Sequence, residues 1–312
     1  MFISKTNNSN DNQESAGGNP TSAEKLIIGL PAGSLKEVTL ALFRRAGFRI
    51  SVEDRSYSPS IDDPEIECLL IRAQEIPTYV EQGILDLGIT GNDWIQEMGA
   101  EVIELGELIY SKKGFNPVSL CLAVPENSPI KTIGGLEGKR IATELVSVTK
   151  KYLEKNNVRA SVEFSWGATE SKPPRLCDAI AELVDSGKSL QANNLKIIGV
   201  IMESTTRLIT NRSAWQNKWK REKMGNITLL LKGALAAENM VGLKMNSQKK
   251  NLRALIGALP PSSKPTVADL SEKGWVALEA ILEENQVKKL IPLFKKIGAE
   301  KIVEYPLNKI ID

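Results

Sequence analysis

Short apolar runs alternate with longer amphipathic segments over most of residues 25–204. Residues 32–48 have the helical repeat, with Ser34 and Glu37 in the capping-box spacing at its start and Gly47 at its end. Residues 65–99 predict strand, helix, strand and helix in turn. This alternation predicts parallel sheets with helices on both faces. The runs that we expect to form strands include residues 25–31, 86–90, 119–125, 139–145, 159–166 and 175–184.

The pattern changes after residue 204. Residues 211–239 predict one long helical stretch, in which Trp215 and Trp219 are four residues apart on one face. That spacing favours core or interface packing over a base-stacking platform. From residue 240 onward the order is strand, helix, strand, strand, helix, strand, which is the ferredoxin-like βαββαβ arrangement. The sequence therefore predicts a two-lobed α/β body followed by a small α+β domain.

The charge balance excludes some partners. Forty Lys and Arg residues against 38 Asp and Glu give a net charge of +2. We find no basic stripe with interleaved aromatic residues, so no nucleic-acid partner is expected. No apolar segment reaches the length that spans a bilayer, so we expect no membrane partner either.

The ends and the cysteines indicate a cytoplasmic protein. Residues 1–24 are rich in Asn, Ser, Gly and Gln and have neither a signal-peptide core nor the arginines of a transit peptide. We interpret them as a disordered tail. Cys68, Cys121 and Cys177 are scattered within apolar runs, as expected for buried thiols in a reducing compartment.

The chain contains no histidine. This absence excludes a Ser-His-Asp triad, a Cys-His pair and a histidine-ligated zinc ion. Any catalysis must depend on carboxylates, Arg or Lys side chains, backbone amides or an oxygen-ligated metal such as Mg²⁺. Positioning and electrostatics would then dominate over proton transfer.

One loop has the composition of a phosphate site. Residues 183–194 read LVDSGKSLQANN, and Gly187-Lys188-Ser189 is similar to the end of a nucleotide-binding P-loop. The P-loop pattern requires a glycine at the position of Glu182, so that interpretation fails. A short polar turn before a helix exposes backbone N–H groups that suit one terminal phosphate. The alternative is an ordinary turn between a strand and a helix.

Several stretches in order resemble one family. They are LPAGSL, IRAQEIPTYVEQGILDLGITGNDW, KRIATEL, CDAIAELVDSGKSLQANNL and EYPLNKII. With the βαββαβ tail, they make the chain similar to the long form of ATP phosphoribosyltransferase from about residue 25 to the end. The resemblance implies a body like that of periplasmic binding proteins. It also implies the condensation of ATP with 5-phosphoribosyl 1-pyrophosphate, which yields N1-(5-phosphoribosyl)-ATP and pyrophosphate as the first step of histidine biosynthesis.

The resemblance also implies a domain organisation and partners. After the tail at 1–24, residues 25–112 and 196–232 would form catalytic domain I, and residues 113–195 would form domain II. Residues 233–312 would form a regulatory domain that binds histidine as a feedback inhibitor. Mg²⁺ would offset the charge of the leaving pyrophosphate, held by substrate phosphates. The chain would assemble into a homo-oligomer, a dimer or a hexamer.

By the same resemblance, the loop would hold the sugar phosphate. Glu182 would face the ribose hydroxyls, and Glu182 and Arg72 are the candidate catalytic residues. Arg72 and Arg55 would bind pyrophosphate or ATP phosphates, where a guanidinium fork suits the oxygens; the alternative for each is a surface ion pair. The residues that would cradle the 5′-phosphate are Asp185, Ser186, Gly187, Lys188 and Ser189.

The expected ATP-binding residues each have an alternative role. Asp93 would be a ligand or the N-cap before Trp94, and Glu170 a ligand or a solvated loop acid. Thr143 would contact phosphate or simply end a strand. The full ATP-binding set is Ser34, Asp93, Thr143 and Glu170, and the histidine-binding candidates in the tail are Thr266 and Leu270.

The sequence departs from the family in its first loop. Family members usually have P-K-G-R there, whereas this chain has Pro31-Ala32-Gly33-Ser34, so two positive charges are lost. The departure motivates one alternative, a catalytically silent regulatory paralogue. A second alternative is a two-lobed solute-binding protein, which would bind its ligand without turnover.

Overall fold

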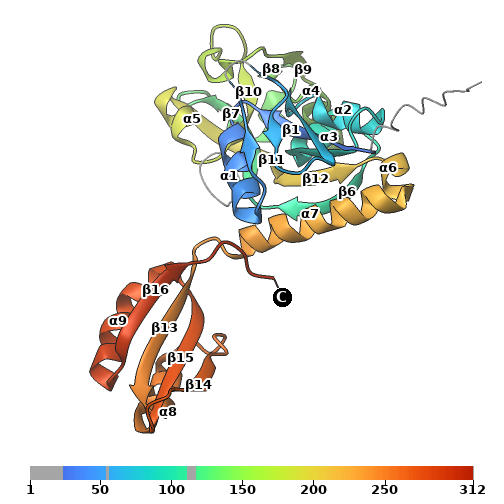
Figure 1. The fold of residues 1–312 in the computed structure, drawn as a ribbon. Helices are drawn as coiled ribbons and strands as arrows, with labels where there is room; N and C mark the ends of the chain where they lie inside the picture. Colours follow the sequence, from blue (N-terminus) through green and yellow to red (C-terminus); the bar gives the residue numbers. More distant parts are fainter. Residues whose placement is uncertain (1–23, 54–55, 111–116, 312) are drawn as a thin grey trace, which may run out of the picture.

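The computed structural model describes residues 24–53, 56–110 and 117–311. Two sheets form the body, and a third sheet forms a separate C-terminal unit beyond the helix α7 (Lys218–Ala236). Figure 1 shows α7 running along the body and this unit, the tail, standing beyond one end of α7. The expected α/β body with a ferredoxin-like tail is confirmed.

The first lobe is built on a five-stranded sheet. β1 (Leu26–Ala32) is the second strand in the sheet order β4-β1-β5-β12-β6. It is parallel to β4 (Ile66–Arg72) and β5 (Leu87–Gly91), but β12 (Thr206–Thr210) is antiparallel to both β5 and β6 (Ile103–Leu108). The expectation of a wholly parallel sheet is wrong here, because β12 enters from the second lobe without a crossover helix.

Helices cover both faces of this sheet. α1 (Lys36–Ala46) packs with α7 on one face, where Phe43 and Ile227 share a core with Leu26 and Ile28. On the other face, α2 (Ile76–Glu81) and α3 (Asn92–Met98) form a second cluster together with the strand residue Ile27. Alternate β1 side chains therefore serve opposite faces, as a strand requires. A short hairpin of β2 (Ile50–Ser51) and β3 (Ser60–Ile61) adjoins β4.

The predicted cap of α1 is wrong at its start and right at its end. The helix begins at Lys36, its N-cap position is Leu35, and no side chain caps it. Ser34 lies in the preceding turn. Gly47 ends the helix with φ of 105°, a left-handed conformation that favours glycine.

The second lobe is a mixed sheet with the order β11-β7-β10-β8-β9. β7 runs antiparallel to both of its neighbours, so this sheet also departs from the parallel prediction. All of β11 pairs with the second lobe, so the chain returns to the first lobe after Ser204, later than residue 196. Its elements are β7 (Val118–Pro125), β8 (Arg140–Thr143), α4 (Val146–Lys155), β9 (Ser161–Phe164), β10 (Ala179–Val184), α5 (Lys188–Ala192) and β11 (Leu195–Ser204), with single 3-10 turns at Ile133–Leu136 and Thr169–Ser171.

The predicted long helix at 211–239 is two helices. α6 (Arg212–Gln216) ends before Asn217, whose Oδ1 accepts from the Lys220 N–H at 3.0 Å and caps α7. Trp215 and Trp219 lie on either side of this break. Both pack half-buried against the first-lobe core, which confirms the expectation of core packing.

The tail has the predicted βαββαβ order and an antiparallel sheet arranged β14-β15-β13-β16. Its end returns to the body, where the Ile310 N–H donates to the Gly233 carbonyl at 2.9 Å and Lys309 Nζ to the Ala46 carbonyl at 3.0 Å. No helix among the described residues is long and apolar enough to cross a membrane. The tail elements are β13 (Met240–Gln248), a 3-10 turn (Lys249–Asn251), α8 (Leu252–Ala258), β14 (Thr266–Asp269), β15 (Trp275–Glu283), α9 (Glu284–Ile297) and β16 (Glu300–Pro306).

Candidate active site

The loop between β10 and α5 surrounds a small cavity of about 190 Å³. Gly187 occupies the N-cap position of α5 with φ of 70°, and no other atom lies closer than 4.0 Å to the position of an added Cβ. The left-handed backbone conformation, more than crowding, therefore favours glycine here. The expected phosphate-binding residues that line this cavity together are Asp185, Ser186, Gly187, Lys188 and Ser189, with Glu182 at the end of β10.

Glu182 is the most perturbed acid at this cavity. Burial raises its pKa to about 7, and the negative charges of Glu170 and Glu144 act in the same direction. A hydrogen bond from Thr169 opposes the shift in part. A carboxylate in these surroundings is stabilised by a nearby cation or by hydroxyl donors, which suits a positively charged sugar.

Glu170 lies beside the loop, where it lines the same cavity as Glu182. It accepts a short hydrogen bond from Ser189 Oγ, so it is not simply a solvated acid. The expectation put Glu170 with Ser34 and Asp93, but those two residues line a different cavity. The strand-to-loop connection after β9 brings Glu170 back toward β10, which sequence spacing alone does not reveal.

A cleft of about 350 Å³ lies between the two lobes. Asp185 lines both this cleft and the loop cavity, so the two spaces adjoin. The first lobe contributes Ser34 and Arg72 as expected, and the second lobe contributes Glu144, which the sequence analysis missed. The other lining residues are Ala32, Gly33, Leu35, Ala73, Gln74, Gly91, Asp93, Trp94, Tyr110, Val118, Leu183, Ser204, Thr205 and Thr206.

Asp93 is buried at the wall of this cleft, with 3% of its surface exposed. Ser204 Oγ donates to its Oδ1 at 2.5 Å, and Oδ2 has no partner among the described residues. Burial raises the pKa of Asp93. The N-cap of α3 is Gly91, and no side chain caps the helix, so the alternative role of Asp93 as an N-cap is wrong. Gly91 leaves room for the carboxylate, because a Cβ there would lie 2.1 Å from Oδ1.

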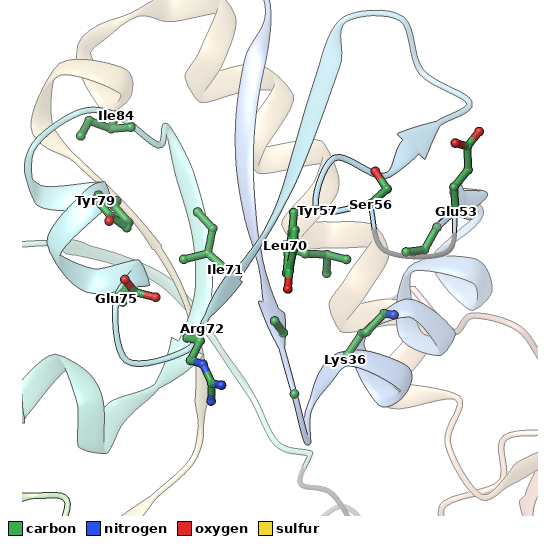
Figure 2. A pocket seen from close by; sticks show the side chains of 13 residues that line it. Lys36, Glu53, Ser56, Tyr57, Leu70, Ile71, Arg72, Glu75, Tyr79 and Ile84 are labelled. Carbon is green, nitrogen blue, oxygen red and sulfur yellow. The ribbon is translucent and has the colours of Figure 1, made fainter. Parts of the chain in front are cut away.

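A larger groove of about 760 Å³ continues from the cleft and shares Ala32, Gly33 and Arg72 with it. Figure 2 shows the Arg72 guanidinium and the Lys36 ammonium at the same end of this groove, on opposite sides of it. Lys36 is a cation that the sequence analysis missed. It lies two positions after Ser34 and supplies positive charge near the loop that lacks the usual Lys and Arg.

The remaining candidates lie elsewhere. Arg55 is outside the described residues. Thr143 is fully buried, its Oγ1 accepts from the Leu145 N–H at 3.0 Å, and it does not line the interlobe cleft. In the tail, Thr266 is exposed on β14, and the Leu270 N–H donates to the Trp275 carbonyl at 3.0 Å.

Comparisons with known proteins agree along the chain. The family model described as ATP phosphoribosyltransferase matches residues 72–233, and the one described as HisG, C-terminal domain, matches residues 237–309. An ATP phosphoribosyltransferase of Chlorobaculum parvum is 55% identical over 92% of this chain and 98% of its own length. One from Desulforudis audaxviator is 56% identical over 92% of this chain and 99% of its own length.

A solved structure shares the fold of the body. An ATP phosphoribosyl transferase complex from Thermotoga maritima has a chain that superposes with a TM-score of 0.57 at 24% identity, covering 66% of this chain and 98% of that one. This likeness supports the fold only. The two family models and the extent of the two relatives carry the assignment: the chain belongs to the ATP phosphoribosyltransferase family, in its long form with the C-terminal domain.

Proposed function

We propose that this chain condenses ATP with 5-phosphoribosyl 1-pyrophosphate to give N1-(5-phosphoribosyl)-ATP and pyrophosphate, the first step of histidine biosynthesis. The observation that carries the proposal is the loop cavity with Glu182, which opens into the interlobe cleft through their shared residue Asp185. One space suits a ribose phosphate and the adjoining space a purine nucleotide. Two substrates bound in this way meet where the lobes face each other.

The reaction needs no histidine. N1 of adenine attacks the anomeric carbon, a C–N bond forms, and the C–O bond to pyrophosphate breaks with its electron pair leaving on oxygen. Positive charge develops on the sugar in the transition state. Glu182 and Glu170, both at the loop cavity, supply the negative charge that stabilises it. The backbone N–H groups of Ser186 to Ser189 would bind the 5′-phosphate.

Cations at the groove would receive the phosphates of the leaving group or of ATP. Arg72 at the end of β4 and Lys36 on α1 both line it, and Arg72 also lines the cleft. Asp93 and Ser34 would contact the nucleotide from the first lobe. The unpartnered Oδ2 of Asp93 supports this role, because a buried acceptor without a donor is costly until a ligand supplies one.

Mg²⁺ would act through the substrates. Among the described residues no cluster of three or more Asp, Glu, Cys or His side chains could hold a metal ion by itself. The available carboxylates, such as Asp185 beside the loop cavity, fit a magnesium ion that is held mainly by pyrophosphate oxygens. When bound, Mg²⁺ supplies positive charge that offsets the charge of pyrophosphate.

Regulation by histidine would depend on the tail. The tail has its own core, so it can move as a unit against the body. Its junction with the body contains an ion pair between Arg45 and Glu238 and the bonds of the C-terminal residues to α1 and α7. Histidine bound near Thr266 and Leu270 would favour one arrangement of this junction. We further propose that the enzyme is cytoplasmic and works as a homo-oligomer.

One experiment tests the proposal against its rivals. The purified chain alone is incubated with ATP, 5-phosphoribosyl 1-pyrophosphate and Mg²⁺, and pyrophosphate and phosphoribosyl-ATP are measured, with and without free histidine. We expect turnover that histidine reduces. Binding without turnover would favour a solute-binding protein or a silent paralogue. Turnover that histidine leaves unchanged would reject only the feedback part.

A further inference from the structure

Helix α3 belongs to the first lobe but is attached at its start to the end of β11. The Asn92 N–H donates to the Thr205 carbonyl at 2.9 Å, and the Asp93 N–H donates to Ser204 Oγ at 3.0 Å. Ser204 ends β11 of the second lobe, and Thr205 connects it to β12 of the first. Trp94 then packs half-buried against the core of the second lobe. The first turn of α3 therefore lies where the chain passes from one lobe to the other.

The last turn of α3 reaches the second lobe by a different contact. The Glu97 carboxylate accepts from the Ser147 N–H at 2.9 Å through Oε1 and from the Val148 N–H at 3.0 Å through Oε2. These N–H groups lie in the first turn of α4, where no intrahelical partner exists for them. The residue at the N-cap of α4, Leu145, provides no side-chain cap. Glu97 thus caps a helix of the other lobe, with a charge that the helix dipole favours.

We propose that Glu97 is a positioning residue that sets the separation of the two lobes across the cleft. Asp93 and Glu97 are four residues apart on α3, so they share one helix face. Glu144, which precedes α4, lines the cleft with Asp93. The cap therefore connects the two segments that carry these opposing residues. The kinetic consequence rests on the proposed function, whereas the geometric one does not.

A merely structural cap is the competing explanation, and the chain contains a matched control. Glu137 in the second lobe accepts from the Arg159 N–H at 2.8 Å through its carboxylate. Both partners of that bond lie in one lobe. Glu137→Ala therefore removes the same kind of carboxylate–backbone bond without any effect on how the lobes face each other.

The kinetic test compares wild type with Glu97→Ala, Glu97→Gln and Glu137→Ala. We expect Glu97→Ala to lower kcat/KM at least tenfold, mainly by raising KM for both substrates, because each substrate site draws residues from the cleft. Glu97→Gln keeps one acceptor oxygen and should fall between the two, while Glu137→Ala should stay within twofold of wild type. A Glu97→Ala enzyme as active as the Glu137→Ala control would overturn the proposal.

A second measurement requires no activity. Spin labels are placed at the exposed positions Arg49 of the first lobe and Lys151 of the second by cysteine substitution, and pulsed electron resonance gives the distance between them. Glu97→Ala should broaden and lengthen this distance distribution, and Glu137→Ala should leave it unchanged. An unchanged distribution in Glu97→Ala would reject the positioning role. An inactive wild type would instead reject the proposed function and leave the distance test in force.

Discussion

Replacing Glu182 with glutamine is expected to stabilise the folded protein at neutral and alkaline pH. The pKa of this buried carboxyl is raised from 4.5 to about 7, so the fold disfavours its charged form. One pKa unit corresponds to about 1.4 kcal/mol, which puts the full cost of ionising the carboxyl in the fold at about 3 kcal/mol. The glutamine amide is buried too, so we expect a net gain of about 1–3 kcal/mol at pH 8.

The pH dependence gives the sign of the effect. Below the unfolded pKa the carboxyl is neutral in both states and costs nothing. The cost then grows as pH rises toward the folded pKa and is constant above it. The advantage of Glu182→Gln over wild type should therefore increase by about 2 kcal/mol between pH 5 and pH 8.

Urea unfolding of both proteins across this pH range measures the difference. Glu163→Gln, an exposed substitution on β9, is the matched control and should follow the pH dependence of wild type. The reasoning would be refuted by Glu182→Gln curves that run parallel to wild type over the whole range. In the proposed function the same variant should lose kcat/KM, because an amide cannot supply negative charge to the sugar. A more stable and less active enzyme is the expected combination.

Two further predictions follow from local geometry. Gly187→Val forces a β-branched residue into φ of 70°, so we expect at least tenfold weaker binding of 5-phosphoribosyl 1-pyrophosphate, about 1.4 kcal/mol, by calorimetry. ATP affinity is the internal control, and equal sugar-phosphate affinity would mean that the loop is an ordinary turn. Asn217→Ala removes the cap of α7 and should lower the free energy of unfolding by about 1 kcal/mol in urea. Unchanged stability would show that the α6–α7 break does not depend on this side chain.

Local patterns were sufficient for much of the fold. The βαββαβ order of the tail could be read from apolar periodicity, because each strand and helix there carries its own repeat. The phosphate loop was also predictable, since Glu182 and residues 185–189 are contiguous and contiguous residues stay together in any fold. The missing histidines narrowed the chemistry without any structural knowledge.

Other features depended on contacts between distant segments. The sheets are mixed because β7 and β12 pair antiparallel with strands far away in sequence, and period-2 patterns do not encode the direction of a neighbour. The break at Asn217 depends on a side-chain cap within an otherwise helical stretch.

The composition of the site itself was decided only by the tertiary structure. Glu170 joins the sugar-phosphate cavity because the chain after β9 brings it against Ser189. Lys36 and Glu144 join the groove and the cleft for the same kind of reason. The sequence by itself determined which contiguous stretches carry phosphate and nucleotide chemistry. Which charged residues from separate segments meet there was decided by sheet pairing and lobe packing, since burial and repulsion act between neighbours in space and not in sequence.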